Sequence, residues 1–147
     1  MKKIIIIIST ALLLGCLLTF LVFKNNEVRA QKNNSLITAK AFQIGVYNEE
    51  NNALKIAIRN NGLVIKEDDK YRVYVAIIYN EETVTKIAKY FNNIELSYYI
   101  KEVTIPTYTY EKVKIYEELI NKSNPDTYNT ILKDILKVYE GVLWVRK

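Results

Sequence analysis

The most pronounced hydrophobic segment of the chain is an uncharged run near its start, from Ile4 to Phe23. At about 1.5 Å per helical residue this run would reach roughly 30 Å, which is the thickness of a bilayer's hydrocarbon core. Lys2 and Lys3 precede the run, and Lys24 follows it. The pattern predicts a single-pass membrane helix that stays in the protein, with residues 1–3 as a cytoplasmic tail and the remainder outside the cell membrane.

Two other readings of this segment stay open. Val28-Arg29-Ala30 is a weak signal-peptidase pattern, although the apolar run is longer than the 7–15 residues or so of a secretory core. The segment Leu13 to Cys16 is similar to a lipoprotein signal, but the apolar run continues beyond it to Phe23. A retained anchor is the interpretation that fits the whole run.

Beyond the anchor, residues 24–40 are polar and rich in asparagine, which is typical of a flexible stalk. Strand-like alternation follows in four segments, and two of the gaps between them have helical periodicity. The predicted strands are Ala41–Val46, Leu63–Lys66, Tyr71–Ile78 and Glu95–Ile105, and Asp68-Asp69 is predicted to be a turn.

The two helical segments begin in the same way. Asn48 and Asn80 are each followed by two glutamates, as expected of a cap and a first helical turn. The first helix has its apolar stripe at Ala53, Leu54, Ala57 and Ile58, and the second at Val84, Ile87, Ala88 and Phe91. The glutamate pairs are therefore explained by the helix dipole, and not as catalytic carboxylates.

The order βαββαβ, together with this internal repeat, predicts an α+β split-βαβ (ferredoxin-like) domain over residues 41–105. Such a domain has a four-stranded antiparallel sheet with two helices on one face. Residues 106–147 are predicted to form a helical extension, with helices over Glu111–Asn121 and Pro125–Glu140 and an apolar tail at Val142 to Trp144.

Composition restricts the chemistry. The 147 residues contain no histidine, and the single cysteine lies in the apolar run. Most zinc sites and most Ser-His or Cys-His catalysis are thereby excluded, so we expect no enzyme activity, no metal and no cofactor. The net charge of +5 is modest and is dispersed along the chain, which is typical of a solvated surface.

The sheet face that the two predicted helices leave free holds the candidate site. Alternation places Ala76 and a set of polar and aromatic side chains on that face. Aromatic rings among amide, hydroxyl and cationic groups suit a carbohydrate ligand, whereas a membrane anchor argues against nucleic acid. A solvated face, or one covered by residues 107–147, is the alternative. The candidate residues are Gln43, Gly45, Arg72, Tyr74, Ser97, Tyr99 and Lys101.

Residues 41–101 resemble a SPOR domain, the bacterial peptidoglycan-binding module. The similarity lies in Phe42 to Tyr47, in Gly62-Leu63, in Tyr71-Arg72-Val73 and in Asn80 to Phe91. The resemblance implies binding of septal glycan strands stripped of stem peptides, in cell division or sporulation, by Gln43, Arg72 and Tyr74 among others. It also implies a membrane helix and a domain in the cell wall.

The sequence thus predicts a membrane-anchored, non-catalytic protein that binds peptidoglycan. The second hypothesis is a membrane-tethered protein-interaction module, in which the C-terminal helices cover the sheet and bind a membrane or division protein. The apolar tail and the Tyr108-Thr109-Tyr110 segment favour this second hypothesis.

Overall fold

The computed structural model of the protein describes residues 35–140 and 142. The predicted membrane helix at 4–23 and most of the predicted stalk lie outside these residues. Within them, no helix is both long enough and apolar enough to cross a bilayer. The chain divides into two units, Met1–Ser35 and Leu36–Lys147, and the second unit contains the fold described below.

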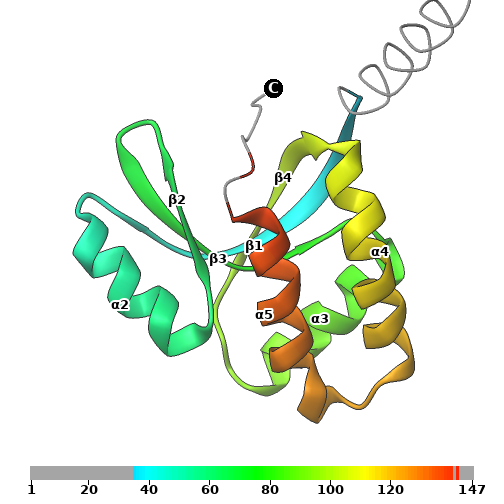
Figure 1. Ribbon diagram of the computed structural model, residues 1–147. Coiled ribbons are helices and arrows are strands. Elements are labelled where there is room, and N and C mark those ends of the chain that lie inside the picture. Colours follow the sequence, from blue (N-terminus) through cyan, green and yellow to red (C-terminus); the bar gives the residue numbers. More distant parts are fainter. Residues whose placement is uncertain (1–34, 141, 143–147) are drawn as a thin grey trace, which may run out of the picture. The chain divides into compact units, whose positions relative to one another are not determined.

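The predicted βαββαβ order is confirmed, and further helices follow it (Figure 1). Its four strands form an antiparallel sheet in the order β2-β3-β1-β4, which is consistent with a ferredoxin-like fold. The elements are β1 Leu36–Tyr47, α2 Glu50–Asn60, β2 Leu63–Glu67, β3 Lys70–Ile78, α3 Glu81–Asn93, β4 Tyr99–Pro106, α4 Thr107–Lys122, the 3₁₀ turn Pro125–Thr127 and α5 Tyr128–Tyr139.

Two strand starts differ from the sequence prediction by more than one residue. β1 begins at Leu36, within the segment expected to be stalk, because residues 36–40 pair with residues 102–106 of β4. β4 begins at Tyr99 and not at Glu95, where the backbone has a positive φ of 56°. A left-handed residue interrupts extended backbone, so the strand starts only after it.

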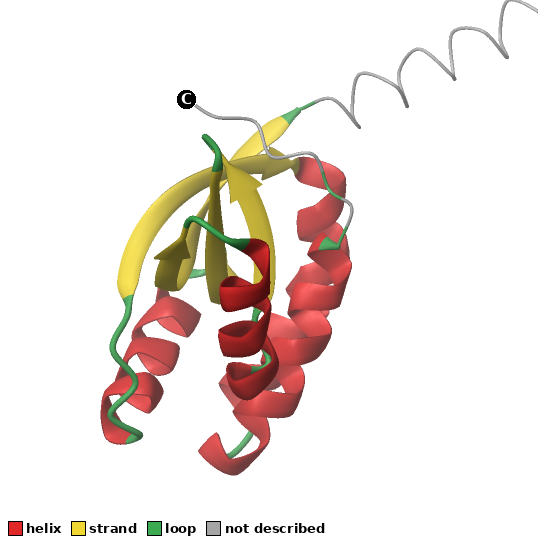
Figure 2. Ribbon diagram, turned by 90° about the vertical axis from the view of Figure 1, so that its left-hand side faces the viewer, coloured by secondary structure: helices red, strands yellow, loops and turns green. Residues whose placement is uncertain are grey.

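The sheet is buried on both faces along β3. Every residue from Val73 to Ile78 is buried, and successive strand residues point to opposite faces. Val73 clusters with Ala53 and Ala57 of α2, while α5 also packs against β3. The helices gather along the curved sheet, as Figure 2 shows.

The apolar stripe predicted for α3 is confirmed, but that of α2 is half wrong. Val84, Ile87 and Phe91 of α3 are buried. On α2 only the alanines are buried, whereas Leu54 is 40% exposed and Ile58 is 78% exposed. The small alanines bring α2 close to the sheet and Ile56 packs beside them, whereas Leu54 and Ile58 remain exposed.

The C-terminal helices belong to the main core. Ile131, Ile135 and Tyr139 of α5 are buried in the same cluster as Phe42 and Ile77 of the sheet. α4 starts at Thr107, directly after Pro106 and earlier than predicted, and packs against β1 and β4. Residues 107–139 are therefore a structural part of the folded unit.

Candidate functional site

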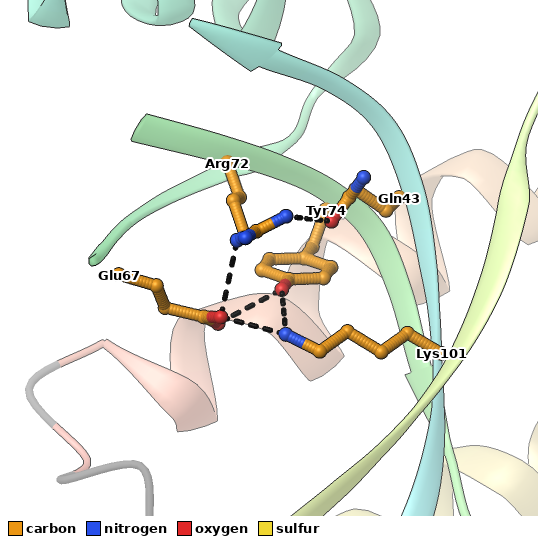
Figure 3. A network of polar contacts seen from close by, with 5 residues as sticks. All are labelled: Gln43, Glu67, Arg72, Tyr74 and Lys101. Atoms are coloured by element: carbon orange, nitrogen blue, oxygen red, sulfur yellow. Dashed lines mark hydrogen bonds and ion pairs between the residues drawn. The ribbon is translucent and has the colours of Figure 1, made fainter. Parts of the chain in front are cut away.

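Four of the seven predicted face residues meet in one polar network (Figure 3). Gln43 comes from β1, Arg72 and Tyr74 come from β3, and Lys101 comes from β4. Glu67 at the end of β2 joins them, so that the network draws on all four strands.

Glu67 lies at the centre of the network. Tyr74 Oη donates a hydrogen bond to Glu67 Oε1 at 2.8 Å, and Lys101 Nζ donates one to Glu67 Oε2 at 2.6 Å. Arg72 Nε forms an ion pair with Glu67 Oε2 at 3.1 Å. Arg72 Nη1 in turn donates to Gln43 Oε1 at 3.2 Å, and Lys101 Nζ also contacts Tyr74 Oη at 3.4 Å.

The Glu67–Lys101 ion pair joins the two edge strands of the sheet. β2 and β4 are separated by β3 and β1, which in a flat sheet would place the edges about 14 Å apart at roughly 4.8 Å per strand spacing. Contact between their side chains therefore requires long side chains on a strongly curved sheet. The network holds the two edges together across this face.

The tyrosine of the network is buried and neutral. Tyr74 is completely buried, and the Glu67 side chain is only 9% exposed. Burial, followed by the hydrogen bond to Glu67, raises the pKa of Tyr74, so its phenol is a neutral donor. One carboxylate thus faces two cations and one neutral hydroxyl, and its acceptor oxygens are used within the protein.

The remaining three predicted residues are not among the five that form this network. Tyr99 is 66% exposed and pairs in register with Gln43. Ser97 is exposed and precedes β4. Gly45 lies under the Tyr47 ring, and a Cβ added to Gly45 would come within 2.5 Å of the ring atoms. Of the two aromatic residues expected to form an exposed platform, only Tyr99 is accessible.

Strand irregularities explain why alternation did not place every side chain correctly. Phe42 pairs with Ala76, whereas the next residue, Gln43, pairs with Tyr74. The register therefore skips Val75, and a bulge of this kind changes which residues share a face. Ala76, expected on the outward face, lies opposite Phe42, whose ring packs on Phe91 of α3.

Sequence reasoning missed Glu67. It precedes the Asp68-Asp69 turn, and that turn is confirmed by positive φ values of 47° and 57°. A tight turn fixes the register, with Glu67 opposite Lys70 and Ile65 opposite Arg72. Counting back from the turn would have placed Glu67 on the same face as Arg72 and Tyr74.

A second buried carboxylate lies outside this network. Glu117 of α4 is 3% exposed and accepts hydrogen bonds from the backbone N–H groups of Tyr79 and Asn80, at 2.8 and 2.9 Å. Burial raises the pKa of Glu117, and the two N–H donors oppose that rise. The carboxylate joins α4 to the start of α3, which is a structural role.

No metal-ligating cluster occurs among residues 35–140 and 142. Comparison with protein-family models, curated proteins and solved structures finds no match for this chain.

Proposed function

We propose that this protein is a membrane-tethered, non-catalytic protein-interaction module. The observation that carries the proposal is the complete burial of Tyr74, the aromatic residue at the centre of the face expected to bind glycan. Its hydroxyl is bonded to Glu67, and the neighbouring Gln43, Arg72 and Lys101 are bonded within the same network.

A carbohydrate site needs an exposed ring and polar groups that can turn to the sugar hydroxyls. Here an incoming sugar would have to break charge-assisted bonds around Glu67 before it gained any of its own. Burial of the C-terminal helices in the same core also favours the interaction hypothesis over an open sheet face. The uncharged run at 4–23 supports the tether, with the N-terminus in the cytoplasm and the folded unit outside.

Binding of septal peptidoglycan is the second candidate. The exposed ring of Tyr99, opposite Gln43, is the observation that favours it, together with the resemblance of residues 41–101 to SPOR domains. One accessible aromatic ring and one adjacent amide would make a small glycan-contacting surface on β4 and β1.

Co-sedimentation with purified cell-wall sacculi separates the two candidates. The fragment Ser35–Lys147 would be mixed with sacculi, with and without amidase treatment, and the pellet assayed. We expect no pelleting with either sample. Saturable pelleting that Tyr99→Ala abolishes, and that Tyr108→Ala on α4 leaves intact, would instead establish glycan binding; Tyr108 is a matched control at 39% exposure.

A further inference from the structure

An open groove of about 680 Å³ lies beside β2, between α2 and α5. Six of its fourteen lining residues are aliphatic and five are charged. From α2 it includes Leu54 and Ile58, from β2 Val64 and Lys66, and from α5 Lys133 and Leu136. This groove is distinct from the Glu67 network, since none of the five network residues lines it.

The α2 side of the groove is unusually apolar for an exposed surface. Leu54 and Ile58 are 40% and 78% exposed, and they lie one helical turn apart. Residues spaced i, i+4 are neighbours on a helix, so the two side chains form one continuous strip. The helix packs on the sheet through Ala53 and Ala57, and that packing does not use this strip. An exposed aliphatic strip beside a groove is a feature of interaction sites.

β2 is also an edge strand. It lies at the end of the sheet order, and within the described part of the chain no other strand pairs with its outer side. The outer edge of such a strand presents N–H and C=O groups that can bind another extended chain. Addition of a peptide strand to a sheet edge is a common mode of recognition, in which the main chain supplies affinity and alternate side chains supply specificity.

We propose that this groove binds an extended segment of a partner protein, which adds to β2 as a further strand and carries an acidic residue two positions from an apolar one. The proposal rests on the protein-interaction function proposed above. Val64 and Lys66 lie two positions apart and so point to the same face of β2. Val64 packs in the α2 cluster, so this face is the one that α2 covers.

Cross-strand pairing then specifies the ligand. An apolar side chain opposite Val64 would extend the apolar strip of α2, and a carboxylate opposite Lys66 would pair with its ammonium group. Lys66 lies over the Tyr71 ring at 5.7 Å. Neither Lys66 nor Lys133 forms an ion pair with the residues that the structure describes. The lining as a whole holds three lysines and two glutamates, Glu50 and Glu140, so the groove has a net positive charge that favours an acidic partner.

The test uses the full chain in detergent micelles and a fluorescein-labelled heptapeptide, Thr-Val-Thr-Glu-Thr-Val-Thr, followed by fluorescence anisotropy. We expect saturable binding that weakens about tenfold in Ile58→Glu and in Lys66→Glu, the effect of one unfavourable charged contact. Ile115→Glu is the matched control, because Ile115 is 71% exposed on α4 and outside the groove, and should leave binding unchanged.

A charge exchange sharpens the test. The same peptide with lysine in place of glutamate should bind the unmodified chain about tenfold more weakly, yet bind Lys66→Glu better than the glutamate peptide does. Amide hydrogen exchange at Val64 to Lys66 should slow when the peptide is bound, and proline in place of the threonine that follows glutamate should abolish binding.

Several results would overturn the proposal. They are an absence of peptide binding, a loss of affinity in Ile115→Glu equal to that in the groove variants, or equal affinity for the peptides with and without proline. Binding only after removal of residues 143–147 would assign the groove to the chain's own end, and a dimer lost in Ile58→Glu would assign it to a second copy. If the peptide does not bind and the protein does not pellet with sacculi, only the groove proposal fails and the proposed protein-interaction function stands. Pelleting that depends on Tyr99 would overturn the proposed function itself.

Discussion

Glu67 accepts hydrogen bonds from Tyr74 and Lys101 and forms an ion pair with Arg72, and these three side chains belong to two other strands. Replacing it with glutamine would leave Arg72 and Lys101 close together without their shared carboxylate. Breaking a fully buried pair costs about 3–5 kcal/mol, but Arg72 and Lys101 are 21% and 27% exposed, so water offsets part of that cost. We expect Glu67→Gln to lower the free energy of unfolding by about 2 kcal/mol, measured by urea denaturation.

Glu102 provides the matched control for this substitution. Its carboxylate contacts Lys40 at 2.6 Å, the same distance as in the Glu67–Lys101 pair, but the Glu102 side chain is 68% exposed. Exposed pairs contribute roughly 0–1 kcal/mol, so Glu102→Gln should change stability by less than about 1 kcal/mol. Equal losses in the two variants would show that burial of the network does not strengthen it.

Glu117 gives a prediction about pH. Because burial raises its pKa in the folded protein above that in the unfolded chain, the folded state holds the proton more strongly. The contribution of Glu117 to stability is therefore fully present at low pH and declines as the pH rises through the folded pKa. Gln at position 117 does not titrate, so Glu117→Gln should gain stability relative to the unmodified protein as the pH is raised from about 4, the usual glutamate range, to neutrality.

The measurement is urea denaturation of both proteins across that interval. The difference between their free energies of unfolding isolates Glu117, because the other groups titrate in both proteins. If Glu117→Gln instead loses stability relative to the unmodified protein as the pH rises, the N–H donors of Tyr79 and Asn80 outweigh burial and the pKa of Glu117 is lowered.

At the scale of elements, the two helices with the same sequence signature begin differently. Asn80 caps α3, since its Oδ1 accepts from the Thr83 N–H at 3.1 Å. Asn48 does not cap α2: the cap position is Glu49, which makes no side-chain cap bond, and Asn48 Oδ1 accepts from Lys70 of β3 instead. A tertiary contact has thus replaced the local bond that the sequence pattern predicted.

This contrast predicts unequal costs for the same substitution. Asn80→Ala should lower the free energy of unfolding by about 1 kcal/mol, the usual cost of losing an N-cap. Asn48→Ala removes only an exposed side-chain contact and should cost less than about 0.5 kcal/mol. Thermal unfolding followed by circular dichroism would compare the two variants, and a larger loss in Asn48→Ala would contradict the assignment of the caps.

The order of strands and helices could be read from sequence, because local periodicity and turn residues determine it. The candidate site could be read only in part. Gln43, Arg72, Tyr74 and Lys101 do lie together, but strand parity cannot show which element covers a face. The bulge near Val75, the burial of Tyr74 and the ion pair between Glu67 and Lys101 all depend on contacts between residues distant in sequence.

At the scale of the whole molecule, the C-terminal helices and the sheet share one core. The buried apolar residues contributed by these helices include Val113, Ile120, Ile131, Leu132, Ile135 and Leu136. Each such side chain contributes roughly 1.5–3 kcal/mol when buried, so the six together contribute roughly 9–18 kcal/mol, which is comparable with the entire stability of an ordinary domain.

A fragment that stops at Pro106 should therefore fail to fold, although it contains the complete βαββαβ pattern. We expect Ser35–Pro106 to show no cooperative thermal transition, whereas Ser35–Val142 should unfold in one transition, as expected of a single core. The second fragment keeps α4 and α5 and so controls for shortening of the chain. A cooperative transition in the shorter fragment would mean that the sheet and its first two helices are stable alone. The C-terminal helices would then be a separable cover, and the sheet face beneath them could open to a ligand. If the sheet and the C-terminal helices instead unfold together, every ligand has to bind on the outside of one closed core.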